Sequence, residues 1–141
     1  MKKVIQTLQA FAQALKTLHT SVQLFKEKPV EYDADIHLAL RDSMIQRFKY
    51  CTHLFWEVLK MYLEHEMVHI PVPSTQENIR EAVNIRFLSK DEGDLAMAMI
   101  DSRMKTPLAY DQKIAEELAK DIPDYYVLMH TILERLQKLV N

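Results

Sequence analysis

The segment His65-Glu66-Met67-Val68-His69 has the spacing of a zinc-hydrolase motif. On a helix, histidines four residues apart share a face and can bind zinc, while the glutamate acts as a general base. Here the motif stands directly before Ile70-Pro71, where a helix has to end, and no signature of a third ligand follows it. We therefore expect a solvated helix end and no bound metal, with His65 and His69 as the candidate ligands of an alternative zinc hydrolase.

Two arginines lie on the apolar faces of their helices. Counting by helical steps places both Arg103 and Arg47 in line with buried-type residues. A guanidinium stays protonated, so at such a position it must meet a carboxylate, a phosphate or the opening of a cleft. One interpretation is a set of buried structural ion pairs, with Asp42 or Asp101 as partners. The other is an anion site in a groove or at a dimer interface, and the sequence leaves both open.

Five aromatic side chains also fall at helical spacing, namely Trp56, Tyr50, Tyr110, Tyr125 and Tyr126. At such spacing most aromatic residues belong to a core or an interface, and a minority line a ligand site. Cys51 is the one cysteine and lies on an apolar stripe, which indicates an inert buried thiol and excludes a disulfide framework. Neither Ser43 nor Ser102 stands at a strand-to-helix elbow, so the sequence supports no nucleophilic triad.

Helices must position these residues, because the composition disfavours the alternatives. The chain has a mass of 16.6 kDa and 141 residues. Of these residues 48% are apolar and 27% are charged, as in ordinary globular domains. Its single glycine, Gly93, is too few for barrels, sandwiches or doubly wound sheets, which use glycine in turns and bulges. One glycine also cannot build a phosphate-binding or dinucleotide-binding loop.

The charge balance limits the kinds of partner. The net charge of −2 includes no strongly basic stripe, so broad binding to nucleic acid is not expected, although a local nucleotide site is compatible with this balance. No uncharged stretch reaches 18 residues, so we expect no membrane span and a cytoplasmic protein.

Apolar residues at alternating steps of four and three predict two long helices. The first is expected to end at Lys28-Pro29, and its stripe consists of Val4, Leu8, Phe11, Leu15, Leu18, Val22 and Phe25. The second is expected to start at Asp33-Ala34-Asp35 and to fade near His69, before Pro71-Val72-Pro73. Its stripe consists of Leu40, Met44, Phe48, Cys51, Phe55, Val58 and Tyr62. Matching stripes and a short connection predict an antiparallel hairpin.

Two short helices and one long helix are expected to follow. Ser74 and Glu77 predict a capping box that opens the first short helix, and residues 89–93 form a break before the second. The last helix runs from about Asp111 to Val140, and its apolar phase survives Pro123. That predicts one kinked helix, the alternative being a new helix that begins at this proline.

Together these segments predict a single all-α domain over residues 1–141. Its expected architecture is an up-and-down antiparallel helical bundle of five helices, similar to a four-helix bundle. Three long helices form three sides, and the two short helices jointly supply the fourth.

Several segments resemble a known family. Residues 41–48 (RDSMIQRF) and 54–60 (LFWEVLK) are similar to the second-helix signature of the nucleotidyltransferase substrate-binding-protein-like family, part of the HEPN superfamily. Residues 77–82 (ENIREA), 99–103 (MIDSR) and 110–111 (YD) match its later segments in order and spacing. The resemblance implies a dimeric bacterial helical bundle that binds a minimal nucleotidyltransferase, as an accessory subunit or as the toxin of a toxin–antitoxin pair.

The resemblance also bears on individual residues. Active HEPN relatives cut RNA without a metal, using an arginine and a histidine in the dimer cleft, and in many pairs the partner transfers AMP to a nearby tyrosine. Arg103 and Tyr110 match the arginine and the tyrosine, whereas Leu108 stands at the histidine position, and a leucine cannot exchange protons. Lys49 and His53 replace carboxylates of the family pattern.

The sequence thus predicts a non-catalytic accessory subunit without a cofactor. It would bind a minimal nucleotidyltransferase, a nucleotide or both in the cleft of a homodimer, and the candidate binding residues are Arg103, Tyr110, Arg47, Asp42, Trp56 and Lys105. The alternatives are a degenerate HEPN ribonuclease that acts on RNA and the zinc hydrolase described above.

Overall fold

The computed structural model describes residues 2–27, 33–70 and 74–140. Its helices are α1 (Lys2–Glu27), α2 (Ala34–His65), α3 (Thr75–Asn84), α4 (Lys90–Lys105), the short 3-10 helix η1 (Thr106–Leu108) and α5 (Gln112–Val140). The described part of the chain contains no strand. None of these described helices is long and apolar enough to cross a membrane.

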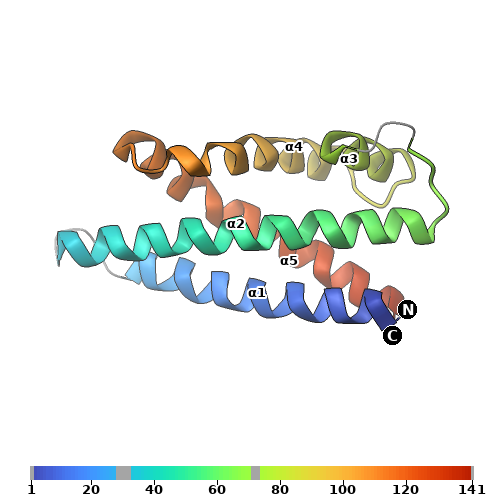
Figure 1. Ribbon diagram of the computed structural model, residues 1–141, viewed down its shortest axis with the longest axis horizontal. Helices are drawn as coiled ribbons and strands as arrows, with labels where there is room; N and C mark the ends of the chain where they lie inside the picture. The colour runs from blue at the N-terminus through green and yellow to red at the C-terminus, as the bar shows by residue number, and fades with distance from the viewer. Residues whose placement is uncertain (1, 28–32, 71–73, 141) are drawn as a thin grey trace.

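The helices form an up-and-down bundle (Figure 1). α1 and α2 are antiparallel neighbours, α4 runs back along α2, and α5 crosses behind α2 to the end where both chain termini lie. α3 and α4 pack against each other and against α2, so they jointly provide the fourth side. The predicted all-α architecture, with three long and two short helices, is confirmed.

The predicted start of α2 is confirmed. Asp33 adopts an extended backbone, and its Oδ1 accepts hydrogen bonds from the backbone N–H groups of Asp35 (2.9 Å) and Ile36 (3.1 Å). These bonds satisfy N–H groups that have no acceptor within the helix. The predicted stops at Lys28-Pro29 and Pro71-Val72-Pro73 lie outside the described residues.

The predicted capping box of α3 is only half formed. Ser74 Oγ accepts a hydrogen bond from the backbone N–H of Glu77 at 3.1 Å, but the Glu77 carboxylate pairs with Arg80. A complete box opens α4 instead, within residues 89–93, which were predicted to form a break. Ser89 Oγ accepts from the N–H of Glu92 (3.1 Å), and Glu92 Oε1 accepts from the N–H of Ser89 (2.8 Å).

α5 is a single helix that contains Pro123. The prediction of one helix is therefore confirmed, and the alternative of a new helix beginning at this proline is wrong. Proline lacks the N–H that would bond to the carbonyl of Ala119, so the helix continues without that bond. Tertiary packing compensates for it, because Ala119 and Ile122 are both buried in the core.

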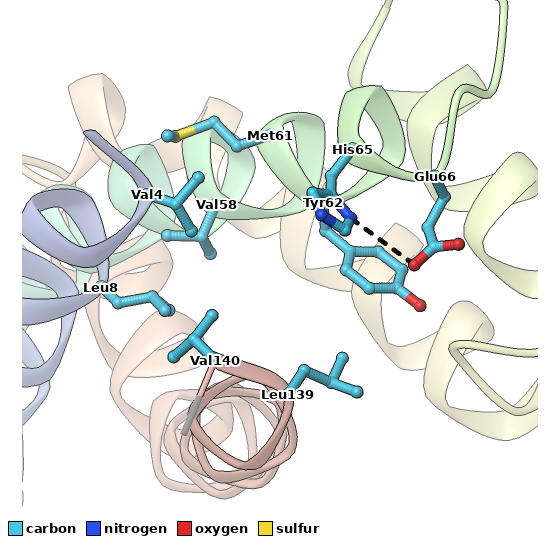
Figure 2. Close-up of a pocket in the computed structure, with 9 residues that line it drawn as sticks. All are labelled: Val4, Leu8, Val58, Met61, Tyr62, His65, Glu66, Leu139 and Val140. Carbon is cyan, nitrogen blue, oxygen red and sulfur yellow. Dashed lines mark ion pairs between the residues drawn. The ribbon is translucent and has the colours of Figure 1, made fainter. Parts of the chain in front are cut away.

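The end of α2 meets both termini of the chain. α2 stops at His65, and the chain then turns through Met67, whose φ is 59°. Beside this turn lies a small apolar cavity of about 70 Å³, lined mainly by α1 residues Val4 and Leu8 and α5 residues Leu139 and Val140, together with the last turns of α2. Figure 2 shows these side chains from three helices directed toward one another.

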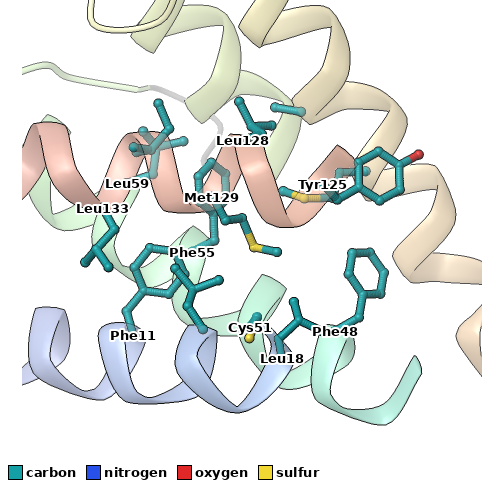
Figure 3. Packing of buried hydrophobic residues seen from close by; sticks show 14 of the residues in the cluster. Phe11, Leu18, Phe48, Cys51, Phe55, Leu59, Tyr125, Leu128, Met129 and Leu133 are labelled. Atoms are coloured by element: carbon teal, nitrogen blue, oxygen red, sulfur yellow. The ribbon is translucent and has the colours of Figure 1, made fainter. Parts of the chain in front are cut away.

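The centre of the bundle is a continuous apolar core (Figure 3). Phe48 stacks on Tyr125 with ring centres 5.6 Å apart, which joins α2 to α5, and the Phe11 and Phe55 rings lie 6.1 Å apart between α1 and α2. Cys51 is fully buried among these groups, and its burial raises the pKa of the thiol to about 12. The predicted buried thiol is confirmed, and it stays protonated at neutral pH.

A polar contact fixes the loop between α3 and α4. The Arg135 guanidinium on α5 binds both carboxylate oxygens of Glu92, at 2.9 and 3.0 Å, and donates to the backbone carbonyl of Phe87 at 2.6 Å. The Phe87 ring also stacks on Tyr62 at 4.1 Å. The hydrogen bonds from Arg135 hold the pKa of Glu92 below its ordinary value.

The Glu92–Arg135 contact predicts a pH-dependent stability. Because the pKa of Glu92 is lower in the folded than in the unfolded chain, its contribution is complete at neutral pH and is lost as the pH falls from about 5 through the folded pKa. We expect Glu92→Gln to lower the free energy of unfolding by about 1–2 kcal/mol at pH 7, since both side chains are partly exposed. Urea unfolding at pH 7 and at lower pH measures this, with the exposed Glu117→Gln as the control. An equal loss at all pH values would contradict it.

Gly93 permits close approach of α4 to α3. A Cβ atom at this position would lie 2.5 Å from Cγ2 of Val83, well inside van der Waals contact. We expect Gly93→Ala to lower the free energy of unfolding by about 1–2 kcal/mol, because the overlap outweighs the gain in helix propensity. Urea unfolding should show this loss, and it should disappear when Gly93→Ala is introduced into a Val83→Ala protein. A stabilised Gly93→Ala single variant would contradict the close packing.

Candidate binding groove between α2 and η1

A polar groove lies between α2 and η1. One wall consists of α2 side chains spaced three to four residues apart, which places them on one helix face. The other wall comes from η1 and the turn that follows it. The lining residues are Asp42, Ile45, Gln46 and Lys49 from α2, and Thr106, Ala109 and Tyr110 from the other wall.

The η1 wall is held in place at both of its ends. Thr106 is buried, and its Oγ donates to the backbone carbonyl of Arg103 (2.8 Å) and accepts from Arg103 Nη1 (3.2 Å). At the other end Asp111 caps α5, its Oδ1 accepting from the backbone N–H groups of Lys113 (2.9 Å) and Ile114 (3.3 Å). The turn that carries Tyr110 is therefore fixed between the end of α4 and the start of α5.

Arg41 ties the α2 wall to the first turn of α5. Only 2% of its side chain is exposed, and Nη1 lies 2.7 Å from Glu116 Oε1 while Nη2 donates to Gln112 Oε1 at 2.8 Å. Its Nε donates to Asp42 Oδ1 at 3.2 Å. A planar guanidinium can satisfy three acceptors in one plane, which a lysine could not do. Arg41 therefore orients Asp42 at the edge of the groove.

Arg41 is the buried arginine of α2, whereas Arg47, which was predicted to lie on the apolar face, is only half-buried. The Nε of Arg47 contacts Ser43 Oγ at 3.4 Å, whereas Asp42 pairs with Arg41. Arg41 occupies the buried stripe because it precedes Met44 by three residues, a spacing that could have revealed it. The proposed ion pairs of Arg47 and Arg103 with Asp42 or Asp101 are not found in the described structure.

Arg103 lies immediately behind the groove. It is half-buried in the last turn of α4, where the helix dipole favours a cation, and its guanidinium folds back onto Thr106. Tyr110 reaches the groove with 81% of its side chain exposed. Leu108 is also largely exposed, and no histidine is among the described residues that line the groove.

The remaining predicted binding residues lie elsewhere. Lys105 is exposed at the end of α4, next to the groove but not among its lining residues. Trp56 packs edge-on against Phe55, with ring centres 4.9 Å apart, and lies about 21 Å from Asp42 along α2. The structure thus brings Asp42 and Tyr110 together, with Arg103 behind them, and leaves Arg47 and Trp56 outside. Gln46 also lines the groove, but the sequence did not predict it, because the groove exists only where the opposite wall meets α2.

The geometry does not support the zinc interpretation. α2 ends at His65, so His69 lies beyond the helix and the two side chains do not share a helix face. Both histidines are exposed, and His65 Nδ1 lies 3.8 Å from Glu66. No group of three or more histidine, cysteine or acidic side chains within the described residues is arranged to hold a metal ion.

Sequence comparison identifies the family. Residues 6–138 match the family described as nucleotidyltransferase substrate-binding-protein-like. The chain belongs to this family. The family resemblance that was based on the α2 signature and the later segments is therefore confirmed, and it extends over nearly all of the chain. No curated protein sequence matches the chain significantly.

Two solved structures are similar to this protein. One is a protein from Thermus thermophilus, with 30% sequence identity and a TM-score of 0.65, covering 84% of this chain and 98% of that one. The other is from Haemophilus influenzae and is described as revealing the fold of a substrate-binding domain of a nucleotidyltransferase. It has 22% identity and a TM-score of 0.78, and covers 92% of this chain and 98% of that one. The second likeness establishes the shared fold.

Arg41 is expected to contribute more to stability than any one of its partners. Arg41→Ala should lower the free energy of unfolding by about 2–4 kcal/mol, because a buried side chain and three hydrogen bonds are lost. Glu116→Gln should cost only about 1 kcal/mol or less, because the Glu116 side chain is 56% exposed and the other two acceptors remain. Urea unfolding of both variants tests this. Equal losses would contradict the buried position of Arg41.

Proposed function

We propose that this protein is the binding subunit of a two-protein nucleotidyltransferase system. It associates with a minimal nucleotidyltransferase and presents a nucleotide in the groove between α2 and η1. The observation that carries the proposal is the meeting of Asp42 and Tyr110 in one groove, in a chain that belongs to a substrate-binding family. The partner, the nucleotide and the toxin–antitoxin role are all parts of this proposal.

The chemistry of the groove suits a nucleotide. Lys49 offers a cation on the α2 wall, and the Arg103 guanidinium lies behind Thr106 on the other wall. Cations in this position would attract a phosphate group. The exposed Tyr110 ring offers a flat face on which a base can stack. Asp42 and Gln46 supply hydrogen-bonding groups for the base or the sugar.

The surface around the groove also suits an interface with a protein. Four large side chains close to the groove in sequence are well exposed, namely Tyr50, Met104, Leu108 and Tyr110. Aromatic residues and methionine are enriched in protein–protein interfaces. We place the homodimer contact and the nucleotidyltransferase contact on this surface, so that a bound nucleotide would be shared between subunits.

The proposal is for binding rather than RNA cleavage. Cleavage without a metal needs side chains that accept and donate protons near neutral pH. The described residues that line the groove include no histidine, the side chain that most often exchanges protons near neutral pH. Leu108, which stands at the family's histidine position, cannot take over that role.

Copurification tests the partner. The tagged protein should retain a minimal nucleotidyltransferase encoded beside it. The complex should elute at the size expected for a homodimer of this protein with its partner bound. Tyr110→Ala and Arg103→Ala should reduce retention by about tenfold or more, because Tyr110 is an exposed interface aromatic and Arg103 holds the η1 wall in place through Thr106. Lys60→Ala, on an exposed position of α2, should have no effect.

Two outcomes would contradict the proposal. The first is a monomer that retains no nucleotidyltransferase under conditions where the protein is folded. The second is RNA cleavage above background by the wild-type protein and not by Arg103→Ala, which would favour the degenerate ribonuclease.

A further inference from the structure

We infer that the groove binds a guanine nucleotide in one orientation, with the base beside Asp42 and Tyr110 and the phosphate beside Lys49 and Arg103. This inference rests on the proposed function, because it specifies the ligand of the same groove. It depends on the order of polar groups along α2 and on contacts that align the two walls.

The charge of the polar α2 side chains changes along the groove from negative through neutral to positive. Asp42, Gln46 and Lys49 all line it, so an acceptor, an amide and a cation follow one another along one helix face. Asp42 and Lys49 are seven residues apart, which corresponds to about 10.5 Å along the helix axis. This is close to the extent of a nucleoside monophosphate from the pairing edge of its base to its phosphate.

Contacts at both ends of the groove position the opposite wall relative to these α2 side chains. At one end, Arg41 binds Gln112, which places the first turn of α5 and the nearby Tyr110 level with Asp42. At the other end, Tyr125 stacks on Phe48 and its hydroxyl lies 2.8 Å from Ser102 Oγ. 

These contacts give the groove two different ends. Ser102 immediately precedes Arg103, so the end of α4 lies level with Phe48 and Lys49. The aromatic ring and the carboxylate are therefore at one end of the groove, while Lys49 lies at the other end and Arg103 stands behind the wall there. A nucleotide matches this arrangement only when its base points toward Asp42.

The carboxylate determines which base is accepted. Asp42 Oδ1 is already bound by Arg41, and 63% of the side chain remains exposed, so its acceptors are oriented and accessible. An ionised carboxylate only accepts hydrogen bonds. Guanine presents two adjacent donors, its N1–H and its amino group, whereas adenine has an acceptor at N1 beside its amino group. Asp42 therefore favours guanine and disfavours adenine.

Lys49 determines where the phosphate of the nucleotide binds, at the other end of the groove. Lys49 is half-buried and lines the groove, so its aliphatic part packs against the protein while its ammonium group is within reach of a phosphate bound there. Loss of the phosphate from the ligand should therefore weaken binding at Lys49 and leave recognition of the base by Asp42 unchanged.

Calorimetric titration of the full-length protein with GMP, AMP and guanosine tests the inference. GMP should bind at least tenfold more tightly than AMP, and guanosine more weakly than GMP. Asp42→Asn keeps an acceptor for Arg41 but adds a donor, so it should reduce the ratio of GMP to AMP affinity to about twofold or less. Lys49→Met should weaken GMP binding about tenfold and leave guanosine binding unchanged.

Controls separate this inference from the proposed function. Lys60→Met, on an exposed position of α2, should bind GMP like the wild-type protein, and thermal unfolding should show that all variants are folded. Equal affinity for GMP and AMP, or a preference that survives Asp42→Asn, would overturn the base assignment. Binding of no nucleotide would overturn the inference as a whole, while retention of the nucleotidyltransferase in the same preparation would leave the partner proposal standing.

Discussion

A permanent charge buried between two helices constrains the whole groove. Removing the Arg41 guanidinium from water is unfavourable unless its nitrogen atoms find acceptors. Glu116 and Gln112 on α5, together with Asp42 on α2, provide those acceptors. The first turn of α5 must therefore remain against α2, and this in turn fixes the position of Tyr110.

A second guanidinium performs the same task at another corner of the bundle. Arg135 joins α5 to the start of α4 and to the loop that precedes it, through Glu92 and the backbone of Phe87. The middle of α5 is attached by apolar contacts such as that between Phe48 and Tyr125. Apolar burial thus supplies most of the packing energy, while the directional contacts of the two arginines determine where the helix ends lie.

The groove lies where helices end, and this explains its chemistry. η1 and the turn after it interrupt the regular helix between α4 and α5, so side chains such as Tyr110 project outward instead of packing in the core. The interrupting residues are themselves held by Thr106 and Asp111. A rigid site of this kind suits the binding of a defined ligand, because little order has to be gained when the ligand arrives.

The sequence by itself determined the helices, because the steps of three and four between apolar residues record which face of each helix is buried. The stripe of α1 and the continuity of α5 through Pro123 were predictable for that reason. The start of α2 at Asp33 was predictable because a carboxylate suits a helix N-terminus. Only the tertiary structure decided that Arg41 meets Glu116 and Gln112 of α5, and that Asp42 faces Tyr110 across the groove. The physical reason is that both features depend on partner groups that distant segments bring into contact, and periodicity within one helix carries no information about those partners.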